Sequence, residues 1–126
     1  MSEIVQLERQ IEEAKAVVEQ RDMMVKLTNN REFKKLIVEG FMKDECSRYT
    51  HLSTQPGISL QDRADALAAA QAAGHLKRWI NAIIMMGNNA EGELGEAKEL
   101  LDELRAEAAD AAQAESFTYA GTEIEV

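Results

Sequence analysis

LKRWINAIIMM, residues 76–86, lies near the middle of the chain and holds its single tryptophan, two adjacent isoleucines and two adjacent methionines. Four residues of this run recur at the spacing i, i+3, i+4, i+7, namely Leu76, Trp79, Ile80 and Ile83. That spacing is typical of a helix with one buried stripe. Residues 84–86 widen the stripe to most of the circumference, which predicts a helix with neighbours on several sides.

The composition predicts a single, predominantly helical domain. The chain has 126 residues, 45% of them hydrophobic and only 5% aromatic, with seven glycines and one proline. Such a length is typical of one domain, and the scarcity of glycine and proline favours long helices. Because much of the hydrophobic fraction is alanine, we expect apolar stripes rather than a thick core.

The net charge of −9 lies entirely in the last third of the chain. Residues 1–89 hold twelve acidic and twelve basic side chains, whereas residues 90–126 hold eleven acidic side chains against Lys98 and Arg105. This acidic third disfavours contact with phosphate backbones. It suits either a basic protein partner or simple solubility.

Two helices are predicted before the only clear loop. The first runs from about Glu3 to Thr28 with a coiled-coil spacing of mostly apolar positions. Its seam consists of Ile4, Leu7, Ile11, Ala14, Val18, Arg21, Val25 and Thr28. Asn29 and Asn30 end this helix and cap a second one, from Arg31 to about Tyr49. The second helix is expected to bury Phe33, Leu36, Ile37, Phe41 and Cys46. Its Gly40 indicates either close approach of another helix or a tolerated weak point.

The loop HLSTQPGIS, residues 51–59, contains the single proline followed by glycine, which is a turn signature. Ser59 and Asp62 then resemble a helix N-cap with an acid at the third helical position. The third predicted helix continues through an alanine-rich stretch into the tryptophan run. Residues 87–95 carry three glycines, so they form either a flexible elbow or a weakened helix. We expect an elbow at residues 87–89.

A fourth helix is predicted from about Ala90, with a second coiled-coil seam. That seam consists of Leu94, Ala97, Leu101, Leu104, Ala108 and Ala111. The resulting fold class is all-α, a four-helix antiparallel arrangement over residues 1–115. Its long N- and C-terminal helices form a coiled-coil stalk, and the middle helices form a denser head.

Residues 116–126 are predicted to form an extended C-terminal tail. Phe117 and Tyr119, and then Ile124 and Val126 beyond Gly121, alternate with polar residues at the period of a strand. An isolated strand is not stable in water, so the tail is either disordered or pairs with another chain.

Residue patterns for catalysis, cofactors or metals are missing, so the chain is expected not to be an enzyme. Cys46 and His51 lack a second pair of metal ligands, and His75 lacks a glutamate three residues before it. The three glycines of residues 87–95 have neither P-loop nor dinucleotide-binding spacing. We therefore expect no catalytic, cofactor-binding or metal site, and no cofactor.

The remaining polar and apolar patterns argue against nucleic acid and membrane partners. A basic cluster of Lys26, Arg31, Lys34 and Lys35 has acidic neighbours and is interpreted as a solvated face, so nucleic acid is an unlikely partner. The longest apolar run, residues 82–86, is far too short to span a membrane. The N-terminus has no pattern of a signal peptide, and one cysteine fits a reducing compartment.

Four segments in this order resemble small helical proteins from the head-morphogenesis region of tailed bacteriophages. They are the Glu/Arg-rich opening helix, NNREFKKLIVEGFMKDECSR, LKRWINAIIMMGNNAE and the acidic C-terminal helix. The resemblance covers about residues 3–110 and assigns no site residue. It implies a virion or assembly protein present in many copies, without catalytic activity, made in the host cytoplasm.

Two functions are therefore weighed. The first is a structural or assembly protein, a helical oligomer that docks on a capsid or other virion shell. The second is a small helical binding module or inhibitor that acts on a host protein or small ligand in the cytoplasm. For the first, the expected protein interface, with other copies and with a larger shell protein, consists of Trp79, Ile80, Ile83, Ile84, Met86, Phe117, Tyr119, Ile124 and Val126.

Overall fold

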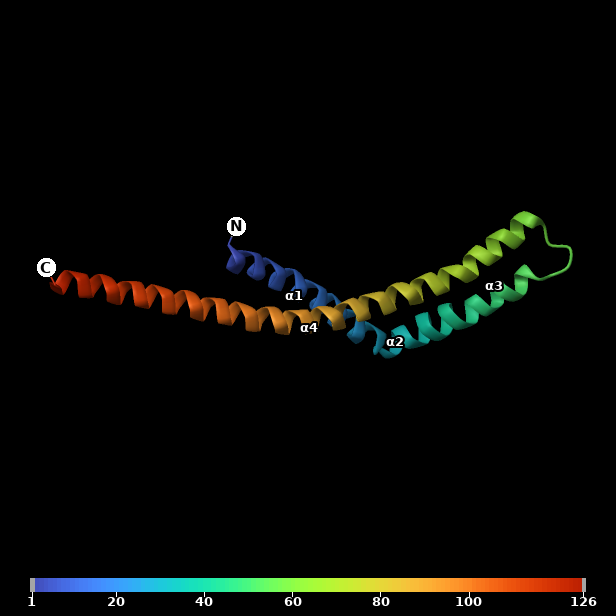
Figure 1. Ribbon diagram of the computed structural model, residues 1–126. Helices are drawn as coiled ribbons and strands as arrows, with labels where there is room; N and C mark the ends of the chain where they lie inside the picture. The colour runs from blue at the N-terminus through green and yellow to red at the C-terminus, as the bar shows by residue number, and fades with distance from the viewer. Residues whose placement is uncertain (1, 126) are drawn as a thin grey trace. The chain divides into compact units, whose positions relative to one another are not determined.

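The computed structural model describes residues 2–125, with side chains for residues 2–115, and no residue in this range belongs to a strand. The elements are α1 (Glu3–Thr28), α2 (Arg31–Phe33), η1 (Lys34–Glu45), α3 (Cys46–Ser53) and α4 (Leu60–Glu125) (Figure 1). Because α2, η1 and α3 follow each other without a break, they form one continuous helix. The all-α prediction is confirmed, but the chain folds into three helices rather than the four that were expected.

The helix ends that the sequence predicts are confirmed where a side chain caps the backbone. The Oδ1 atom of Asn30 accepts a hydrogen bond from the backbone N–H of Phe33 at 2.9 Å. The hydroxyl of Ser59 accepts one from the backbone N–H of Asp62 at 3.0 Å. These bonds satisfy N–H groups that the first turn of a helix leaves free. The loop between α3 and α4 is shorter than the expected residues 51–59, because α3 continues to Ser53.

The elbow predicted at residues 87–89 is wrong, because α4 continues through it as one 66-residue helix. The reason is an unbroken alternation of three- and four-residue steps, which is the heptad of a coiled coil. A seam of buried or half-buried positions of α4 follows it in the order Ala66, Ala69, Ala73, Leu76, Ile80, Ile83, Gly87, Ala90, Leu94, Ala97, Leu101 and Leu104, with Ala70 and Ile84 half-buried beside it. Packing along this seam outweighs the weak helix propensity of the glycines.

The chain divides into two compact units, which are described separately. The stalk unit comprises Met1–Ala16 and Asn89–Val126, and the middle unit comprises Val17–Asn88. Helices α1 and α4 each contribute residues to both units.

In the stalk unit, α1 and α4 pack along an apolar seam and run in opposite directions. Leu7 and Ile11 of α1 are buried against Leu101 of α4. Ile4, Leu94, Ala97 and Leu104 pack around these three residues. At one edge, the Nη2 atom of Arg105 lies 3.3 Å from the Oε1 atom of Glu8. The expected pairing of the N-terminal helix with residues 94–104 is thus observed, whereas Ala108 and Ala111 are exposed.

In the middle unit, the helix from Arg31 to Ser53 lies beside the first part of α4, and the loop at residues 54–59 joins the two (Figure 1). Its core contains Met24 of α1 together with Ile80 and Ile83 of α4. Phe33, Met42, Leu76 and Ile84 pack against this core. Further along, the Sγ atom of Cys46 donates a hydrogen bond to the carbonyl oxygen of Ala70 at 3.4 Å.

The π-helical winding of η1 changes which residues face α4. A π turn contains more residues than an α turn, so the residues that face α4 are spaced further apart in the sequence than in an α-helix. In α-helical winding, the seam that begins at Phe33 and Ile37 would continue to the polar residues Asp44 and His51. The π turns instead place Met42 and Cys46 in half-buried positions and leave Asp44 and His51 exposed. Leu36, which was expected to be buried, is 67% exposed.

The extended tail expected for residues 116–126 is not observed, because α4 continues to Glu125. Alanine is the strongest helix former, and six of the nine residues from 106 to 114 are alanine, so the helix propagates readily into the segment that follows. A strand there has no partner in the described chain. The side chains of Phe117, Tyr119 and Ile124, and the whole of Val126, lie outside the described residues.

Candidate protein-interaction surface

The tryptophan run of α4 has an inner and an outer side. Ile80 and Ile83 are 7% and 6% exposed, and they pack with Met24 inside the middle unit. Ile84 is half-buried against the same core. These three residues were expected to belong to an intermolecular interface. In the structure they form a core between helices of one chain, and their expected role in an interface stays a prediction.

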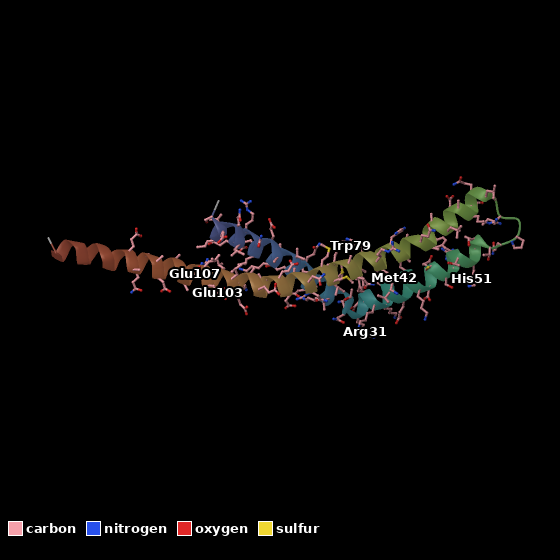
Figure 2. The ribbon with its side chains drawn as sticks, viewed as in Figure 1. Arg31, Met42, His51, Trp79, Glu103 and Glu107 are labelled. Atoms are coloured by element: carbon pink, nitrogen blue, oxygen red, sulfur yellow. The ribbon has the colours of Figure 1, made fainter. Side chains whose placement is uncertain are left out.

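Trp79, Met85 and Met86 form the outer side of the run, which we call the apolar face. Their exposed fractions are 55%, 64% and 56%. Trp79 and Met86 are seven residues apart, so they lie on the same side of α4. Figure 2 shows Trp79 on the side of α4 away from η1, whereas Met42 lies between the two helices. The apolar face is therefore available to another molecule.

The apolar face is exposed because of the number of helices that pack on α4. Met24 of α1 and Met42 of η1 both pack on the side of α4 that carries Ile80 and Ile83. A helix whose neighbours lie along one seam buries little more than the seam positions of each heptad. Trp79 and Met86 directly precede the seam residues Ile80 and Gly87, and Met85 lies one position further out. Large side chains at flanking positions then stay in solvent. Sequence reasoning expected neighbours on several sides of this helix, and the structure provides fewer.

A second feature of the middle unit is a hollow at the loop end, which sequence reasoning missed. It has a volume of about 630 Å³ and is lined by Tyr49, Leu52, Gln55, Pro56, Gly57, Ile58, Asp62, Asp65, Ala66 and Ala69. Gly57 has a φ of 80°, a left-handed conformation that glycine adopts without strain and that shapes the turn. The Pro–Gly dipeptide was the only signal of this hollow. Its lining mixes apolar side chains such as Leu52 and Ile58 with the carboxylates of Asp62 and Asp65, which would favour a cationic ligand.

The chemistry of the described side chains is that of a solvated helical surface. No group of three or more His, Cys, Asp or Glu side chains among them is arranged to hold a metal ion. In one exposed pair, a hydrogen bond from Arg48 lowers the pKa of Glu45 and raises that of Arg48. No helix in the described part of the chain is long and apolar enough to cross a membrane.

Comparison of the chain with known proteins found no similar protein. No family model matches it. The search of curated proteins and the search of solved structures also find no match.

Proposed function

We propose that this chain is a non-enzymatic structural or assembly protein of a virion, which docks through its apolar face on a larger shell protein. The observation that carries the proposal is the exposure of Trp79, Met85 and Met86 on α4. Tryptophan and methionine are enriched in the cores of protein interfaces, where lysine and glutamate are depleted. The resemblance to head-morphogenesis proteins of tailed phages supports a shell as the partner.

The energetics of the apolar face agree with a docking role. A tryptophan side chain can bury about 150–250 Å² on association. Burial of apolar surface stabilises a complex by about 25 cal/mol per Å² before the costs of association are counted. Arg78 lies seven residues before Met85, so it places a cation at the edge of the face. Its charge adds specificity to an otherwise apolar contact.

The experiment is a binding assay with purified particles of the phage that encodes the chain. The single tryptophan lies in the apolar face, so its fluorescence emission should shift to shorter wavelength when the particle covers it. Replacing Met85 and Met86 by glutamate should abolish this shift and the co-sedimentation of the protein with particles. A matched control is Leu67→Glu, which changes another exposed apolar residue of the same helix, 43% exposed.

Mass spectrometry of purified virions provides the second half of the test. A structural protein should be present at stoichiometric copy number. Its absence from virions would contradict the proposal, as would particle binding by the Met85/Met86 variant at full occupancy.

A cytoplasmic binding module or inhibitor is the second candidate function. The hollow at the loop end favours it, because a lining of apolar side chains together with Asp62 and Asp65 suits a small cationic ligand or a basic side chain. Under this function the chain is absent from virions, and Asp62→Asn with Asp65→Asn weakens capture of the ligand. The same variant leaves particle docking through the apolar face unchanged.

A further inference from the structure

The turn between α1 and α2 carries a hollow with a positive lining, which we call the basic hollow. It has a volume of about 390 Å³ and is lined by Asn29, Arg31, Lys34, Lys35 and Glu39. All five residues are exposed, and Figure 2 shows Arg31 pointing away from α4. Three cations therefore surround a hollow that contains a single carboxylate.

The three cations, Arg31, Lys34 and Lys35, form no ion pair with any side chain that the structure describes. The pairs that form are local ones, such as Arg48 with Glu45 at 2.8 Å. The positive potential of the basic hollow is therefore free to attract an acidic group from another molecule.

Helix α4 carries the opposite charge on exposed side chains at and beyond the end of its seam with α1. Glu103, Glu107 and Asp110 recur at i, i+4 and i+7, so they form one line along the helix, which we call the acidic stripe. All three are exposed, and Figure 2 labels Glu103 and Glu107 along α4. The residues three and four positions from each of them include no lysine or arginine.

The acidic stripe is unfavourable for an isolated helix. Glu103 and Glu107 are four residues apart, and Glu107 and Asp110 are three apart, so like charges face each other at both steps. Asp102 differs from these three, because Lys98 lies four residues before it and Arg105 three residues after it. The repulsion along the stripe is relieved when a basic surface covers it.

We propose that the acidic stripe of one copy binds in the basic hollow of a second copy of this chain. The two surfaces match in charge, because three carboxylates at helical spacing meet three cations around a hollow. The inference rests on the proposed assembly function and specifies how copies join. The contact is heterologous, since each copy offers one stripe and one hollow, so it generates rings or filaments rather than closed dimers.

An acidic helix fits the basic hollow better than nucleic acid does. Glu39 lines the hollow and would lie close to a phosphate. The net charge of −9 also repels a polyanion at longer range. A carboxylate stripe on a protein helix can place its three charges on the cations without bringing a continuous phosphate chain past Glu39.

The test is a charge exchange followed by sedimentation velocity on purified full-length protein. One variant combines Lys34→Glu with Lys35→Glu, and the other combines Glu107→Lys with Asp110→Lys. Each variant alone should associate about tenfold more weakly than the wild-type protein, because favourable pairs become repulsive. A mixture of the two should regain association, since every stripe again meets a hollow of opposite charge. High salt should weaken wild-type association.

Matched controls separate this contact from a general effect of net charge. Arg63→Glu with Lys77→Glu changes the charge of the middle unit equally outside the basic hollow, and Glu13→Lys with Glu19→Lys does so on α1. Circular dichroism checks that all variants keep the wild-type helicity. The controls should associate like the wild-type protein in low salt.

Three results would overturn the inference. They are a wild-type monomer at all concentrations in low salt, association that neither salt nor the two variants change, and a mixture that stays dissociated. Binding of a DNA duplex by the wild-type hollow without self-association would also overturn it. Each of these results leaves the particle-docking test unaffected, because that test depends on Met85 and Met86.

Discussion

Gly87 of α4 leaves room for the side chain of Arg21 on α1. It occupies a buried heptad position of α4, and the side chain of Arg21 fills the space beside it. The Nη1 atom of Arg21 also donates a hydrogen bond to the Oδ1 atom of Asn88 at 2.8 Å. Glycine here permits close packing of the arginine stem. In the sequence alone the same glycine resembles a helix breaker, which is why an elbow was expected.

Gly87→Ala should therefore destabilise the protein although alanine is the better helix former. The added Cβ would overlap the Cβ of Arg21 and lie 2.6 Å from its Cγ. Overpacking of this kind costs about 1–3 kcal/mol. Gly92→Ala is the control, because its Cβ meets nothing within 4 Å and should stabilise α4 by about 1 kcal/mol. The melting temperature measured by circular dichroism should fall for Gly87→Ala and rise for Gly92→Ala. Equal shifts of the two melting temperatures would contradict the close packing at Gly87.

At the scale of the element, the sequence predicts local features well. The bounds of α1 and the caps at Asn30 and Ser59 depend on residues within one helical turn, so a pattern is sufficient to find them. The π winding of η1 depends on which of its side chains pack against α4, and no pattern within one helical turn predicts it. For the same reason Leu36, which an α-helical period would bury, is exposed, and Met42 is half-buried.

The seam of the stalk unit provides a prediction for two adjacent residues of α4. Leu101 is 6% exposed in the seam, whereas Leu100 is 46% exposed beside it. Leu101→Asp should lower the free energy of unfolding by about 4 kcal/mol, because it buries an unpaired charge and removes an apolar contact. Ile11→Asp should act similarly from α1. Leu100→Asp should cost about 1 kcal/mol or less. Urea titration measures all three, and equal costs for Leu100 and Leu101 would refute the seam.

At the scale of the whole molecule, the two units differ in charge. Residues 17–88 hold ten basic and eight acidic side chains, whereas the remaining residues hold four basic and fifteen acidic ones. This asymmetry was visible in the sequence as an acidic last third. The candidate surfaces were visible only in part, because the sequence predicts the same interface role for Trp79, which is exposed, and for Ile80, which faces the core. Trp79 and Ile80 are adjacent in the sequence, and the turn of about 100° between them places one side chain in solvent and the other in the core.

Removal of residues 115–126 tests how much of α4 supports the fold. The described side chains from 106 to 115 are all exposed, and the apolar cluster of the stalk unit ends at Leu104. The truncated protein should lose helical signal in proportion to the residues removed and keep its melting temperature. A lower melting temperature would show that the end of α4 stabilises the fold. Particle binding by the truncated protein would separate the apolar face from the C-terminal residues as the docking site.

The seam between Leu7 and Leu101 also determines when each unit can form during synthesis. A ribosome adds about 5–20 residues per second, and domains begin to fold as their residues emerge. The middle unit can form once Asn88 has emerged, because all its residues lie between Val17 and Asn88. Leu7 and Ile11 have no partner in the stalk unit until residues 94–104 are made. The N-terminal part of α1 therefore remains uncovered for several seconds of synthesis. Residues 94–104 then both close the stalk unit and cover the apolar side chains of α1 in the nascent protein.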